Sequence, residues 1–274
     1  MKIIDGILAF ILNLCLLFAT AVGAVFAIAS SPAYYYQQFE ATGIYAQVDE
    51  NGETTPKTIY YIGGDSAKYA HFTDEQLNVL IDHIIEYLFT DKDSFELVMD
   101  DVLLNGVETD DVSVFGEIAV VHMKDVKGLL QTLGWVATLM GVAGAAILFY
   151  FVFRARKGKG GKLLKSTLIF YGAFVGLIAA FCLFTLVQTL AMGVELQYYL
   201  TMIWRNFHYI IFPDPEQAMG SFFNDTLTMI LTLDLFMAAV VQVLVTIACA
   251  VASWLVLAWG LDRRVKRLKI AKGE

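Results

Sequence analysis

The chain has 274 residues, of which 58% are hydrophobic, and its mean hydropathy is +0.62. This composition excludes an ordinary soluble domain of the same size. Several apolar runs reach the roughly 20 residues that a helix needs to cross a bilayer. The sequence therefore predicts an integral membrane protein.

The net charge of −8 hides a strong segregation of charge along the chain. Residues 31–127 contain nineteen Asp or Glu against five Lys or Arg. Residues 154–165 contain six basic residues and no acidic one, and residues 262–274 contain six basic and two acidic. Such segregation indicates that different segments face different compartments.

The three cysteines, Cys15, Cys182 and Cys249, all fall within apolar runs and lie far apart in the sequence. An odd number, with none in a polar segment, argues against a disulfide framework. We expect them to be buried structural thiols.

The first predicted membrane helix occupies residues 1–30, with its apolar run from about residue 7 to 29. A secretory signal peptide is the alternative, because Ala27-Ile28-Ala29 resembles a cleavage site. The apolar run is longer than the roughly 7–15 residues of a signal core, so we favour a retained helix.

Residues 31–127 form a polar segment long enough for a small domain. The alternation at residues 58–62 predicts a short strand or hairpin, and Thr73 followed by Gln76 predicts a capping box before an apolar helical repeat. Residues 93–102 and 113–127 are interpreted as further helices, with a turn at Asn105-Gly106. We expect a mostly α-helical cap domain with a small β element.

Residues 128–274 contain three further predicted spans, at about 129–153, 167–192 and 227–261. The basic loop 154–165 joins the first two, and the connection 193–226 contains an interfacial or partly re-entrant helix that ends before Pro213 and Pro215. The predicted fold is an all-α membrane protein with four transmembrane helices and one cap domain.

The basic segments also predict the orientation. The loop 154–165 and the basic tail are separated by two spans and share one side, which the positive-inside rule makes cytoplasmic. Both termini are then cytoplasmic, and the cap and the connection 193–226 are extracytoplasmic.

Two of the four histidines, His122 and His208, lie in short polar patches at predicted membrane boundaries on the same side. Histidine exchanges a proton near neutral pH, and polar groups near hydrocarbon are costly and tend to be functional. Asp125, on the same helical face as His122, either orients that imidazole or only solvates the helix. A purely structural role for either histidine stays open.

Several neighbours of His208 are candidates for substrate binding. Arg205 and Asn206 could hydrogen-bond a carbonyl, an oxyanion or a lipid phosphate, and Asp225 could pair with Arg205. An aromatic set either forms a membrane-interface belt or lines a dry pocket for acyl chains; its members are Tyr34, Tyr35, Phe207, Tyr209 and Phe212.

Other reaction classes find little support in the sequence. The chain has no Gly-x-Ser-x-Gly elbow, no His-Glu-x-x-His motif and no phosphate-binding or nucleic-acid motif. His122, His208 and Asp225 could supply three metal ligands, but their spacing does not require a metal. We therefore predict no metal or cofactor, and acid–base chemistry on a substrate that carries its own nucleophile.

The motifs His122-Met-Lys-Asp-Val-Lys127 and Phe207-His-Tyr-Ile-Ile-Phe212, with the later Asn224-Asp-Thr-Leu227, resemble those of the lipoprotein intramolecular transacylase (Lit) family. The resemblance covers the whole architecture of one span, a cap and three spans. It implies a bacterial membrane acyltransferase that moves the sn-2 acyl chain of a diacylated lipoprotein to the N-terminal cysteine amine. It also implies that His122 and His208 are the catalytic pair, without assigning which is the base.

Two alternatives belong to other classes. The chain could be a non-enzymatic membrane protein whose acidic cap binds a partner, in which case both histidines are dispensable. It could also be a metal-dependent membrane hydrolase, which metal analysis of the purified protein would distinguish.

Overall fold

A computed structural model describes residues 2–45, 47–48, 54–160, 162–193, 196–212 and 225–273. Their contacts divide the chain into two compact units. The helical unit comprises Met1–Val25, Leu133–Tyr199 and Val241–Glu274, and the cap unit comprises Phe26–Thr132 and Leu200–Val240.

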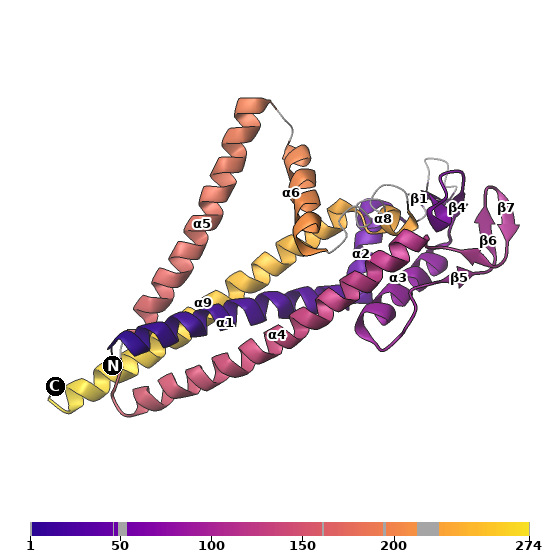
Figure 1. Cartoon of the computed structure of the whole chain (residues 1–274). Coiled ribbons are helices and arrows are strands. Elements are labelled where there is room, and N and C mark those ends of the chain that lie inside the picture. The colour runs from indigo at the N-terminus through magenta and orange to yellow at the C-terminus, as the bar shows by residue number, and fades with distance from the viewer. Residues whose placement is uncertain are drawn as a thin grey trace. The chain divides into compact units, whose positions relative to one another are not determined.

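Four helices are long and apolar enough to cross a membrane: α1 (Lys2–Ala29), α4 (Glu117–Arg156), α5 (Leu163–Met192) and α9 (Leu233–Ala271) (Figure 1). The first three contain a whole predicted apolar run and α9 contains most of the fourth, which confirms the four-span prediction. Because α4 and α9 have 40 and 39 residues, both are much longer than a bilayer requires.

Polar contacts connect the helices within the helical unit. The fully buried Asn13 of α1 accepts a hydrogen bond from Trp254 Nε1 of α9, at 2.8 Å. Asp5 of α1 forms an ion pair with Arg154 of α4, at 2.9 Å. In an apolar bundle such contacts fix which helix faces meet.

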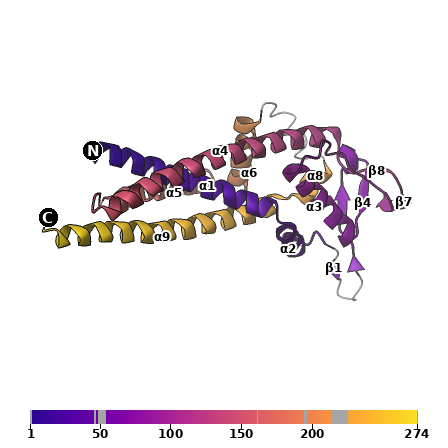
Figure 2. The same ribbon diagram turned by 90° about the horizontal axis from the view of Figure 1, so that it is seen from below.

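The cap unit combines short helices with three small antiparallel sheets (Figure 2). Besides parts of longer helices, it contains α2 (Pro32–Thr42), α3 (Asp74–Phe89) and α8 (Thr226–Ile230), with a 3₁₀ turn, η1 (Ile62–Gly64). The four-stranded sheet has the order β3 (Thr58–Tyr60), β4 (Tyr69–His71), β6 (Val102–Leu104) and β7 (Val107–Thr109). The two-stranded sheets pair β1 (Gln47–Val48) with β2 (Thr54–Thr55), and β5 (Val98–Met99) with β8 (Val112–Ser113).

Helix α3 provides much of the hydrophobic core of the cap unit. The predicted capping box is present, since the Gln76 amide donates to Thr73 Oγ1 at 3.1 Å and the Thr73 amide donates to Gln76 Oε1 at 3.0 Å. The apolar repeat that follows is buried, with Leu80, Ile81 and Ile84 at most 1% exposed. The capping pattern and the period of 3.6 residues together set the start and the inner face of this helix.

The helix predicted at residues 93–102 is wrong, because this segment enters β5 and β6. Phe95 is buried in the core, and its carbonyl lies 2.9 Å from Nε2 of the buried His83. Asn105 and Gly106 form the two-residue turn between β6 and β7, and both have positive φ, at 50° and 81°. This Asn-Gly turn favours a hairpin, and the sheet therefore outweighs the weak helical pattern before it.

Two predicted helix boundaries also differ from the structure. Residue 113 belongs to β8, and α4 begins only at Glu117. The fourth span is interrupted after α8, and α9 begins at Leu233 behind Thr232, whose Oγ1 accepts a hydrogen bond from the Leu235 amide at 3.4 Å. Leu227 and Ile230 bury α8 in the core of the cap unit, which explains why it forms a separate short helix.

Candidate functional site

His122 of α4 and His208 of α6 (Leu196–Ile211) lie side by side in the cap unit, and we call them the histidine pair. Their ring centroids are 5.9 Å apart and their ring planes are inclined by 33°. Both side chains are buried, with 9% and 3% of their surfaces exposed. Two imidazoles that are distant in the sequence therefore meet in one dry location.

Phe212 packs against both members of the histidine pair. Its ring centroid lies 4.9 Å from that of His122 and 5.2 Å from that of His208. Because Phe212 follows His208 by four residues, the two occupy the same helical face, and the Phe212 amide donates to the His208 carbonyl at 3.0 Å. The phenyl ring thus restricts the orientation of both imidazoles and excludes water from one side of them.

The proximity of the two rings limits the charge that they can carry. Two imidazolium charges 5.9 Å apart would repel each other by about 3 kcal/mol at an effective dielectric constant near 20. Burial further disfavours the charged forms. Protonation of both rings at once is therefore unfavourable, which suits one ring to accept a proton while the other donates one.

A buried carboxylate fixes the start of the helix that carries His122. Asp225 is 2% exposed; its Oδ2 accepts a hydrogen bond from the Gly116 amide at 2.8 Å, and its Oδ1 accepts one from the Leu227 amide at 2.9 Å. Burial raises the pKa of the Asp225 carboxyl from 3.8 to about 6, although both hydrogen bonds oppose this shift. Asp225 thus joins the chain before α4 to the N-terminus of α8.

Gly116 permits this close approach because it has no side chain. A Cβ at this position would lie 2.7 Å from Asp225 Oδ2 and 3.0 Å from both the Gly63 carbonyl oxygen and the Gly64 Cα. Thr226 adds a second connection, since its hydroxyl donates to the Val114 carbonyl at 2.7 Å. The backbone of the segment before α4 is therefore hydrogen-bonded to the side chains of two adjacent residues, Asp225 and Thr226.

Two other residues of the first motif position α4 on the cap core. Met123 is 3% exposed and belongs to that core. Lys127 Nζ donates to the Lys92 carbonyl at 2.7 Å and lies 4.5 Å from the centroid of the Tyr87 ring. Sequence reasoning missed these roles and that of Gly116, because each depends on a partner that is distant in the sequence.

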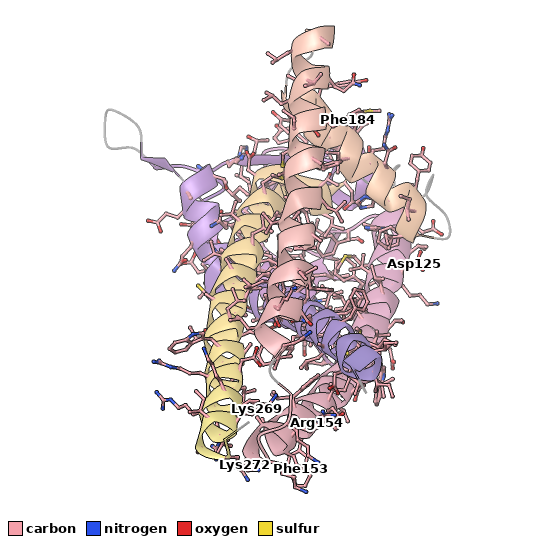
Figure 3. All side chains as sticks on the ribbon, turned by 90° about the vertical axis from the view of Figure 1, so that its left-hand side faces the viewer. Asp125, Phe153, Arg154, Phe184, Lys269 and Lys272 are labelled. Atoms are coloured by element: carbon pink, nitrogen blue, oxygen red, sulfur yellow. The ribbon has the colours of Figure 1, made fainter. Side chains whose placement is uncertain are left out.

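The other residues predicted near the histidines differ in their exposure and their contacts. Asp125 is half-buried on α4 (Figure 3). Arg205, Asn206 and Tyr209 are exposed on α6, and Arg205 contacts the Met202 sulfur at 3.0 Å. Asp225 bonds to backbone amides and does not pair with Arg205. The side chain of Phe207 lies outside the described residues.

Tyr34 and Tyr35 of α2 lie in the core of the cap unit, at 6% and 7% exposure. The Tyr34 hydroxyl donates to the Leu235 carbonyl, and the Tyr35 hydroxyl donates to the Ala29 carbonyl at 3.2 Å. Both hydroxyls thus connect α2 to the ends of the long helices. This arrangement gives the two tyrosines a structural task.

Among the described residues, no three His, Cys, Asp or Glu side chains converge as metal ligands. Asp225, which could have completed a set with the two histidines, uses both carboxylate oxygens on backbone amides. The geometry therefore provides two imidazoles, which can transfer protons, and the Phe212 ring that packs against both.

Comparison with known proteins identifies the family. Residues 8–233 match the family model of the lipoprotein intramolecular transacylase Lit. No curated protein sequence matches the chain. The fold matches in meso crystal structures of the membrane integral lipoprotein intramolecular transacylase Lit from Bacillus cereus. A variant with a histidine replaced by arginine has a TM-score of 0.57 at 16% identity, covering 99% of this chain and 96% of that chain.

Another structure of the Bacillus cereus protein has a TM-score of 0.54 at 17% identity, covering 99% of this chain and 100% of that chain. At such identities the structural likeness shows the fold, a multi-pass membrane protein with four spans. The family match extends over most of the chain, including His122, His208 and Asp225. The chain therefore belongs to the lipoprotein intramolecular transacylase (Lit) family of acyltransferases.

Proposed function

We propose that this chain moves the sn-2 acyl chain of a diacylglyceryl-modified lipoprotein to the α-amine of its N-terminal cysteine. The product is a lyso-form lipoprotein with an amide-linked acyl chain and one remaining ester. The observation that supports this proposal best is the contact between the buried rings of His122 and His208. The family match supplies the substrate class.

The reaction needs only proton transfer and correct placement of the reacting groups. The amine nitrogen attacks the ester carbonyl carbon, forming a C–N bond, and the bond from that carbon to the glyceryl oxygen then breaks. The amine loses one proton and the departing oxygen gains one, so no water, oxidant or cofactor is consumed. One imidazole accepts the first proton and the other donates the second.

Because the nucleophile and the ester belong to the same substrate, most of the remaining rate enhancement comes from holding the two groups in place. Holding the amine against the ester can lower the activation barrier by several kcal/mol, provided the reacting atoms are aligned. Arg205 and Asn206 are exposed on α6, and their proposed role is to hydrogen-bond the ester carbonyl or the glyceryl oxygens of the substrate. The proposed role of the exposed Tyr209 is to contact the acyl chains. These contacts would orient the ester toward the histidine pair.

The same proposal places the enzyme in the bacterial cell membrane with the cap and the histidine pair outside the cytoplasm. His122 precedes the apolar run of α4 by about two helical turns, which puts it close to the edge of the hydrocarbon. The basic loop 154–165 and basic tail would be cytoplasmic, together with both termini. A lipoprotein emerging at the outer leaflet would then reach the pair from the lipid.

Mass spectrometry of a lipoprotein's N-terminal peptide tests the proposal. Purified enzyme in detergent, given a diacylated lipopeptide with a free amine, should yield the N-acyl-S-monoacylglyceryl isomer. Replacing either histidine by glutamine should lower the rate at least about 100-fold, since general acid–base groups contribute roughly 10²–10⁴-fold.

His71→Gln is the matched control, because His71 lies in β4 at partial exposure and belongs to a different part of the cap unit. This variant should keep the wild-type rate. Full activity of both His122→Gln and His208→Gln would refute the acid–base role. Folding of each variant is checked by its elution profile and its unfolding temperature.

A further inference from the structure

The helical unit contains a cleft with a basic rim, remote in sequence from the histidine pair. Its volume is about 630 Å³, and it is formed by the ends of α1, α4, α5 and α9 together with the loop after α4. Cationic side chains from three segments line it, namely Arg154, Lys159, Lys162 and Lys269. Figure 3 shows Arg154 and Lys269 at the same end of the helices.

The two carboxylates in the cleft are already committed to structural contacts. Asp5 accepts hydrogen bonds from Arg154 and from the Tyr150 hydroxyl, each at 2.9 Å. Asp262 accepts the amide hydrogens of Leu163 and Leu164, at 3.2 and 3.1 Å. Asp262 thus caps the N-terminus of α5, where a negative charge is favourable.

The three lysines of the rim therefore remain without a carboxylate. No ion pair of Lys159, Lys162 or Lys269 occurs in the described ranges of the chain. All three are exposed, so each ammonium group can turn toward a ligand. The cleft floor is apolar, with Phe151, Ala155 and Val265 buried beneath the charges.

We propose that this cleft binds the phosphate group of an anionic phospholipid. A phospholipid matches this lining, because its phosphate suits the cations at the rim and its acyl chains suit the apolar floor. Lysine binds phosphate as a point charge, and three ammonium groups exceed the single negative charge that such a headgroup carries. The inference depends only on the side chains that line the cleft, and it is independent of the reaction that the histidine pair performs.

Native mass spectrometry in a neutral detergent tests the proposal with defined lipids. The wild-type protein should retain one dioleoyl phosphatidylglycerol and should not retain dioleoyl phosphatidylcholine under the same conditions. The double variant Lys162→Gln/Lys269→Gln should bind phosphatidylglycerol roughly 5- to 25-fold more weakly, since each exposed charge pair contributes up to about a factor of five.

The double variant Arg264→Gln/Arg267→Gln is the matched control. It removes the same charge from exposed positions on α9 that do not line the cleft, and it should bind phosphatidylglycerol like the wild type. Equal losses in the two double variants would indicate diffuse attraction and overturn the proposal. So would the absence of saturable phosphatidylglycerol binding by the wild type.

A second experiment, with a water-soluble phosphate compound, distinguishes a lipid ligand from a free phosphate ligand. Glycerol 3-phosphate is added to the same proteins, and their unfolding temperatures are compared. The proposal predicts that the soluble compound stabilises the wild type much less than phosphatidylglycerol does at equal concentration. Equal stabilisation by the two, lost only in the lysine variant, would overturn the lipid as ligand and leave a site for soluble phosphate.

Discussion

The chemistry of the histidine pair depends on its surroundings, because an exposed imidazole elsewhere in the chain has the same intrinsic basicity. Burial of both rings and the contact with Phe212 remove competing water, and the distance of 5.9 Å couples their charges. The sequence indicated both histidines as boundary residues. It could not show their contact, which depends on the placement of α6 beside α4.

Asp225 provides a second test of a single residue, which depends on pH. Its pKa is raised by burial to about 6 in the folded protein, compared with about 3.8 when unfolded. The folded state therefore binds more protons than the unfolded state between these values, so the contribution of Asp225 to stability is greatest below pH 4. It declines as the pH rises through 6, by about 3 kcal/mol in total.

Asp225→Asn removes this titration and one acceptor for a backbone amide. The variant should be less stable than the wild type at pH 4.5, and the difference should shrink as the pH rises to 7.5. Unfolding temperatures of both proteins in detergent, measured across this range, provide the comparison. A difference that stays constant with pH would contradict the assigned role of the carboxyl.

At the scale of elements, the start of α4 determines where His122 lies. The chain before this helix is fixed by Asp225 and Thr226, while Met123 and Lys127 anchor its first turns on the cap core. Local patterns predicted α3 correctly, because its capping box and apolar repeat lie within one segment. They failed at residues 93–102, where strand pairing with distant residues decides the structure.

Gly116→Ala tests the importance of this start. The added methyl group would meet two backbone atoms of Gly63 and Gly64 at 3.0 Å as well as the Asp225 carboxylate, so the segment must shift. We expect a loss of about 1–3 kcal/mol in stability and reduced transacylation.

Gly128→Ala is the matched control on the same helix. A Cβ at Gly128 has no atom within 4 Å, and alanine favours helix by roughly 0.5–1 kcal/mol. This variant should therefore be as stable as the wild type or slightly more so, when both are measured by thermal unfolding. Equal destabilisation by the two substitutions would refute the close contact at Gly116.

At the scale of the whole molecule, hydrophobicity predicted all four long helices, because each helix carries a long apolar run within its own segment. The contacts between helices required coordinates, since they depend on which faces meet. Asn13 illustrates this point: in sequence it is one polar residue in an apolar run, yet it receives the Trp254 indole N–H. Its own amide nitrogen donates to the Ala9 carbonyl at 2.7 Å.

A double-mutant cycle measures this contact between α1 and α9. Asn13→Leu leaves the Trp254 N–H without its acceptor and should cost about 0.6–1.7 kcal/mol. Trp254→Phe removes the donor, and the double variant should be more stable than the sum of the single losses predicts. Strict additivity of the unfolding free energies would show that the two residues do not interact.

The most direct test of the central claim follows one labelled acyl chain through the reaction. A diacylated lipopeptide deuterated only in its sn-2 chain is incubated with the wild type, with each single histidine variant and with the double variant. We expect tandem mass spectrometry of the wild-type product to find the label on the cysteine amide, and each single variant to be nearly as inactive as the double variant. Label remaining in the ester, or rapid transfer by the double variant, would contradict acid–base transfer of the sn-2 chain by the histidine pair.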